Sequence, residues 1–182
     1  MKFADSVRET TIKYLEQIRA ANENIKKFEK EGKEYYSETY FNQKLDELKK
    51  AKQDIIDLAK GEIVAIVTDY KAKIANMDVL DGANVTPDIA LLDGKRKITQ
   101  RDLESMFDRA TGNRTMQRII MDYSQDYDLP ISRAFFSVQL KEQGADNLKN
   151  YAISALTSEW GAAFLETDSY FEKIVSEAIR ED

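Results

Sequence analysis

The stretch V-R-E-T-T-I-K-Y-L-E-Q-I-R-A-A-N-E-N-I-K-K-F, residues 7–28, decides the fold of the first part of this chain. Apolar or small side chains recur in it at alternating steps of four and three, and most other positions are charged or amide residues. This spacing places the recurring side chains on one stripe of an α-helix that packs against another helix. The stripe consists of Val7, Thr11, Tyr14, Ile18, Ala21, Ile25 and Phe28.

A second stripe with the same spacing follows a polar run, in which Gly32 is expected to end the first helix. The second helix is expected to begin near Ser37 or Thr39, and Lys52 is the polar exception in its stripe. Because the connection is short, residues 1–77 are predicted to form an antiparallel hairpin. An aromatic cluster is expected at the tip of this hairpin, made of Tyr35, Tyr36, Tyr40 and Phe41.

The predicted fold class is therefore all-α, with a long, coiled-coil-like antiparallel helical hairpin and a smaller C-terminal helical bundle. Residues 78–98 are predicted to be a connector with one short helical turn. The turn begins at residues 86–88, where Thr, Pro and Asp supply a cap, a first helical residue and an acid. Residues 99–182 are predicted to form the bundle, which packs on or beside the hairpin.

The helix boundaries inside this bundle are predicted from caps and glycines. Thr99 and Thr115 are expected to cap the first two helices, which the Gly-Asn pair at residues 112–113 separates. Further along, Gly144 is expected to end a helix and Asp146 to cap the next one. The final amphipathic helix is expected to carry Tyr170, Phe171, Ile174, Val175, Ala178 and Ile179.

Composition agrees with a folded helical chain. The 182 residues are 42% hydrophobic and 33% charged, which is too apolar for a disordered chain, and only 7 Gly and 2 Pro are present. The chain turns polar directly after its first residues and has no apolar run of membrane-spanning length. We therefore expect no signal peptide and no membrane partner, and a location in the bacterial cytoplasm or in a virion.

The chain contains neither Cys nor His. This absence excludes disulfides, thiol nucleophiles, Cys/His zinc sites and a histidine general base. No glycine-rich phosphate loop is present either. We therefore expect no enzyme activity, no catalytic residues, no cofactor and no metal site.

Two acidic segments were weighed as binding sites. Residues 93–104 faintly resemble a calcium loop, but only Asp93 fits the ligand pattern and Glu104 lies at the wrong spacing. A turn followed by a capped helix explains this segment better. The closely spaced acids Asp122, Asp126 and Asp128 alternate with tyrosines and are interpreted as an exposed helix end.

Residues 99–127 could also form a helix-turn-helix that binds DNA. The second helix would present Arg114, Gln117 and Arg118 to bases or phosphates. Two helices joined by a short glycine turn are a common packing unit, however, so nucleic-acid binding is kept only as the alternative. The last third of the chain is acidic and would repel nucleic acid.

Residues 98–123 resemble a segment found in small helical proteins from the structural gene clusters of phages and prophages of Gram-positive bacteria. The matching residues are Ile98, Thr99, Asp102, Leu103, Asn113, Thr115, Met116, Arg118, Ile120 and Tyr123. This resemblance covers about thirty residues. It implies a role in virion structure or assembly, as a scaffold-like or minor head protein, and it implies no catalytic residues.

The function expected from these observations is that of a structural or assembly protein of a phage or prophage particle. It would act through helix-mediated contacts with copies of itself, as a homo-oligomer, or with capsid-type proteins. The apolar face of the second helix widens near residues 63–67, which predicts more than one packing partner there. The candidate protein-interaction residues are Phe41, Leu45, Leu48, Ile63, Ile66, Val67 and Tyr70.

Overall fold

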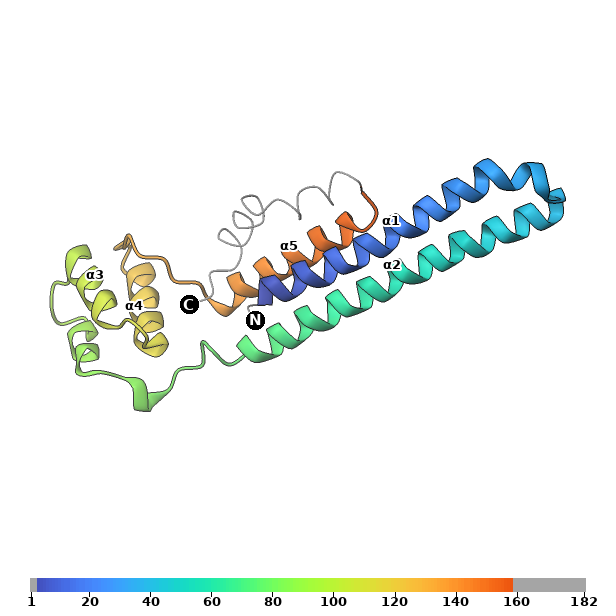
Figure 1. Ribbon diagram of the computed structural model, residues 1–182. Helices are drawn as coiled ribbons and strands as arrows, with labels where there is room; N and C mark the ends of the chain where they lie inside the picture. Colours follow the sequence, from blue (N-terminus) through green and yellow to red (C-terminus); the bar gives the residue numbers. More distant parts are fainter. Residues whose placement is uncertain (1–2, 159–182) are drawn as a thin grey trace. The chain divides into compact units, whose positions relative to one another are not determined.

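A computed structural model describes residues 3–158, and every regular element in this part of the chain is helical (Figure 1). The all-α prediction is therefore confirmed. The chain divides into two compact units. Of the described residues, the hairpin unit contains 3–72 and 141–158, and the inserted unit contains 73–140. The predicted final helix lies outside the described residues.

The hairpin unit consists of α1 (Phe3–Tyr35), α2 (Glu38–Ile74) and α5 (Val138–Ala155). The two long helices run side by side in opposite directions, as predicted, and α5 lies along them near their open end (Figure 1). Ser37 precedes α2, and its side-chain oxygen accepts the backbone N–H of Tyr40 at 3.4 Å. This contact agrees with the predicted start of the second helix.

One apolar core joins the three helices of the hairpin unit. It combines the stripe of α1 from Phe3 to Ile18 with the stripe of α2 from Ile56 to Val67. The widened face of α2 therefore packs against two helices, as its sequence predicts. The α5 side of this core consists of small residues and leucines, namely Ala145, Leu148, Ala152, Ala155 and Leu156.

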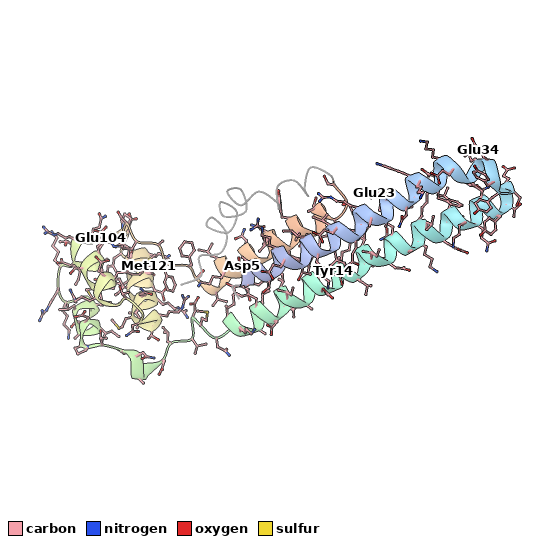
Figure 2. The ribbon with its side chains drawn as sticks, in the orientation of Figure 1. Asp5, Tyr14, Glu23, Glu34, Glu104 and Met121 are labelled. Atoms are coloured by element: carbon pink, nitrogen blue, oxygen red, sulfur yellow. The ribbon has the colours of Figure 1, made fainter. Side chains whose placement is uncertain are left out.

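Thr11 and Tyr14 are polar members of this core. The Thr11 hydroxyl donates to the Val7 carbonyl at 2.7 Å, so its burial leaves no unpaired polar group. Tyr14 faces Glu62 of α2, and a hydrogen bond with that carboxylate raises the pKa of the Tyr14 phenol. Figure 2 labels Tyr14 on α1, on the side of this helix that faces α2.

The helix boundaries differ from the prediction at two glycines. The helix α1 continues through Gly32 to Tyr35, and α5 continues through Gly144, so neither glycine ends a helix. Both are buried. A side chain at Gly32 would lie 3.1 Å from the Phe41 ring, so the residue is glycine because two elements approach closely there. Asp146 lies inside α5 and caps nothing.

The inserted unit contains η1 (Gly82–Asn84), η2 (Pro87–Leu92), α3 (Gln100–Arg109) and α4 (Arg114–Asp126). The helices α3 and α4 pack on each other around a core that includes Leu103, Met116 and Ile120. Residues 86–88 begin η2 as predicted, with Thr86 as its N-cap.

The two predicted caps in this unit have different outcomes. Thr99 caps α3 in a reciprocal capping box with Asp102, and the hydrogen bonds from Thr99 lower the pKa of the Asp102 carboxyl. Thr115 does not cap α4. Asn113 does so instead by accepting the Met116 N–H at 3.1 Å, and Thr115 is buried and accepts the Asp81 N–H.

The grouping of the described helices is set by packing. The helix α5 groups with the hairpin, whereas α3 and α4 group with the connector. The physical reason is the small-residue face of α5, which fits closely against the two long helices. This fit depends on a partner far away in the sequence, so local periodicity does not reveal it.

Candidate protein-interaction surface

The distal arm, residues 19–55, is the part of the hairpin beyond the three-helix core. None of its residues belongs to the buried part of that core, which ends at Ile18 on α1 and begins again at Ile56 on α2. A pair of helices buries less apolar surface than three helices do, and it usually needs a further partner. The distal arm is therefore the candidate docking surface of the hairpin unit.

The aromatic tip, Phe28 with residues 35–41, ends this arm. Phe28 stacks on Phe41 with a centroid distance of 5.2 Å and also on Tyr36 at 5.9 Å. Tyr36 contacts Tyr40 at 4.9 Å. The buried member is Phe41, over which Gly32 lies, so this ring anchors the tip.

The outer tyrosines of the aromatic tip are exposed. Tyr35 has 76% of its surface accessible, and Tyr36 and Tyr40 have 49% each. Three large aromatic side chains gathered around the connection between α1 and α2 are unusual for a surface that only faces water. Tyrosines of this kind are enriched at the centres of protein interfaces, because they combine a large apolar ring with a hydroxyl group.

Two hollows flank the aromatic tip. One, of about 700 Å³, is lined by Lys33, Tyr36, Phe41 and Leu45 among others. The other, of about 380 Å³, is lined by aromatic residues together with Lys44 and Leu48. Both hollows combine apolar side chains with charged residues of both signs, because Glu29 and Glu38 line the first and Glu31 lines the second.

The charge at the tip is locally balanced on α2. Lys44 donates to Glu47 at 2.8 Å, and this hydrogen bond raises the pKa of the lysine and lowers the pKa of the Glu47 carboxyl. Both side chains are well exposed, so the pair adds little stability. The surface of the tip therefore combines this charged pair with aromatic side chains, and the exposed tyrosines are its main apolar groups.

The predicted interaction residues separate into two groups. Phe41, Leu45 and Leu48 lie at or beside the aromatic tip. Ile63 and Val67 are instead buried in the three-helix core, and α1 and α5 cover them, so they are not available to another protein. Ile66 and Tyr70 are half-buried against the same core, and Tyr70 stacks on Phe3 at 4.0 Å.

The exposed tyrosines are absent from the predicted interaction residues. Their cluster at the tip was recognised in the sequence, but they do not belong to an apolar stripe. The sequence feature that could have identified them is the occurrence of three tyrosines close together in a polar segment between two helices. A solvent-exposed connection does not require aromatic side chains.

The arginines predicted to contact nucleic acid are engaged within the inserted unit. Arg114 pairs with Asp78, donates to the Phe136 carbonyl at 3.0 Å and lies over the Phe135 ring. Its side chain is only 19% exposed. Arg118 donates to the Asp78 carbonyl and lies 3.5 Å from Asp122.

The helix-turn-helix surface is therefore used internally. Asp78 also accepts the Val138 N–H, so this one carboxylate joins both ends of the inserted unit to α4. Gln117 is half-buried. Two of the three side chains expected to reach DNA instead stabilise the fold of their own chain.

The carboxylates of the calcium-loop-like segment also serve local structure. Asp93 accepts the Lys95 N–H, and Glu104 accepts the Ser132 N–H at 3.0 Å, which lowers the pKa of the Glu104 carboxyl. Within residues 3–158 no three acidic side chains come together in a way that could hold a metal ion. No helix in this same part of the chain is both long enough and apolar enough to span a bilayer.

Comparison of the chain with protein-family models, with curated proteins and with solved structures found no match. The aromatic tip is therefore the structural observation that bears on function.

Proposed function

We propose that this chain is a structural or assembly protein of a phage or prophage particle, and that it acts through helix-mediated contacts made by the aromatic tip. The observation that carries this proposal is the exposure of Tyr35, Tyr36 and Tyr40 at the end of a two-helix arm. The resemblance of residues 98–123 supplies the phage context.

The arrangement of the hairpin unit supports this role. The three-helix core anchors the proximal halves of α1 and α2, and the arm carries the tip tyrosines about seventeen residues away from the end of that core. Seventeen helical residues correspond to about 25 Å. The arm can therefore place its tyrosines against a copy of the chain or a capsid-type protein while the core stays intact.

Helix-mediated docking by the tip has a direct test in solution. The variant Tyr35→Ser/Tyr36→Ser/Tyr40→Ser removes the exposed rings, whereas the control Leu58→Ser/Val64→Ser removes exposed apolar side chains elsewhere on α2. The control should leave the free energy of unfolding within about 0.5 kcal/mol of wild type, whereas the tip variant should lose about 1–2 kcal/mol because Tyr36 stacks on Phe28 and contacts Tyr40, and it should remain folded. Light scattering after size exclusion, over a series of concentrations, would measure self-association.

We expect the wild-type chain and the control to associate, and the tip variant to lose at least about tenfold in affinity, as interface tyrosines often contribute 1.4 kcal/mol or more. Co-sedimentation with particles from a phage-producing host extends the test to capsid-type partners. A wild-type chain that stays monomeric and also fails to co-sediment contradicts the proposal, as does equal weakening by the control.

A further inference from the structure

A groove lies in the hairpin unit where α5 ends and the two long helices continue. It has a volume of about 720 Å³. Its walls come from all three helices, with Ile18 and Ile25 of α1, Ile56 of α2 and Leu156 after α5 among the apolar lining residues. The groove therefore lies directly beyond the end of α5, between the same two long helices that α5 packs against.

The groove also has a basic side. Lys49 and Lys52 of α2 line it together with Arg19 of α1. Lys52 is half-buried, and it is the polar exception in the apolar stripe of α2. Among residues 3–158, neither Lys49 nor Lys52 forms a salt bridge. A cation held in a partly apolar groove is stabilised when an acidic group pairs with it.

The described part of the chain ends at the groove itself, because Ser158 is one of its lining residues. The 24 residues that follow carry seven acidic and two basic side chains. They also carry Trp160, the single tryptophan of the protein, and the amphipathic pattern of residues 170–179. In helical form 24 residues would extend about 36 Å, which is more than enough to cover the groove.

We infer that residues 159–182 of the same chain dock in this groove, with acidic side chains facing Lys49 and Lys52 and apolar side chains continuing the stripe of α5. The charge of the segment is complementary to the basic side of the groove. The segment is also tethered at the groove's edge, which gives it a high effective concentration over any separate acidic helix. The inference does not depend on the proposed function of the aromatic tip.

Zero-length carbodiimide cross-linking of the full chain tests this inference, because it joins a lysine only to a carboxylate in direct contact. We expect links from Lys49 or Lys52 to acids in residues 159–182, within one chain and independent of protein concentration. The exposed residues Lys26 and Lys30 of α1 serve as controls and should give no such links. Links formed only between two chains, and only at high concentration, would show that a second copy supplies the segment and would overturn the inference.

The fluorescence of Trp160 gives an independent readout. The variant Lys49→Glu/Lys52→Glu should shift its emission to the red and make it more accessible to acrylamide, because the acidic segment is now repelled. The control Lys26→Glu/Lys30→Glu changes the net charge by the same amount and should leave both properties at their wild-type values. A tryptophan that is fully accessible in the wild-type chain, or equal shifts in both variants, contradicts docking in the groove.

Discussion

The proximal and distal halves of the hairpin share one sequence pattern but differ in what covers them. In both halves apolar residues recur at steps of three and four along α1 and α2. In the proximal half α5 completes a three-helix core, whereas residues 19–55 form a two-helix arm that ends in exposed tyrosines. The same stripe therefore stabilises the fold at one end and presents a surface at the other.

The largest expected effect comes from truncating matched leucines in the two halves. Leu148 is completely buried in the three-helix core, whereas Leu48 is half-buried in the arm. We expect Leu148→Ala to lower the free energy of unfolding by about 3–4 kcal/mol and Leu48→Ala by about 1–2 kcal/mol, because fewer groups surround Leu48. Urea denaturation would measure both values. Equal losses would contradict the division of the hairpin into a core and an arm.

The inserted unit differs from the proximal half of the hairpin in what stabilises it. An ion pair holds the ends of the inserted unit together, whereas a third long helix completes the hairpin core. Arg114→Ala would leave the half-buried Asp78 carboxylate without its partner, and we expect a loss of about 3 kcal/mol from this unit. Thermal unfolding would measure the change. Unchanged stability combined with loss of DNA binding at low salt would instead favour the helix-turn-helix interpretation.

Substituting alanine for each of the two glycines inside the long helices should change the free energy of unfolding by a smaller amount, and not equally at the two positions. Gly61 has open space around it, so Gly61→Ala should stabilise the chain by about 0.8 kcal/mol through helix propensity. At Gly32 the added methyl group would press on the Phe41 ring, and the crowding should cancel or reverse that gain. Chemical denaturation of both variants would test this, and equal stabilisation would show that Gly32 is not a packing residue.

The smallest effect concerns the ion pairs that hold α5 on the proximal half. Asp146 lies 2.7 Å from Lys149 and 2.6 Å from Lys71, and these two hydrogen bonds lower the pKa of its carboxyl. The stabilisation is therefore present above the ordinary Asp pKa of about 3.9 and is lost as the pH falls through the lowered value.

Because Asp146 is well exposed, Asp146→Asn should cost at most about 1 kcal/mol at neutral pH. The difference between wild type and variant should vanish in acid, where both side chains are neutral. Urea denaturation over a pH series would measure it. A difference that persists at low pH would show that the residue acts through packing instead of charge.

The hairpin was predictable because its apolar spacing is local and long. The capping box at Thr99 was predictable for the same reason, since both partners lie within four residues. The membership of α5 was not, because it depends on helices distant in sequence, and the role of Gly32 was not, because it depends on the contact with Phe41 of the next helix. The sequence alone does not distinguish a glycine that permits close packing from a glycine that ends a helix.

The interaction surface was predicted only in part. The predicted interaction residues come from two parts of the α2 stripe, but nothing in the stripe distinguishes Ile63, which is buried in the three-helix core, from Leu48, which is half-buried beside the aromatic tip. Likewise the charge of Arg114 suggested nucleic acid, because the sequence does not show that Asp78, 36 residues away, already pairs with it.

Hydrogen–deuterium exchange of the associated and dilute forms of the full chain tests most directly whether the aromatic tip is the docking surface. Association is expected to slow exchange in peptides covering residues 28–48, and to leave peptides covering residues 56–67 unchanged because α5 already protects them. Protection confined to the proximal half or to the inserted unit, with no change at the tip, would contradict the assignment of the tip as the docking surface.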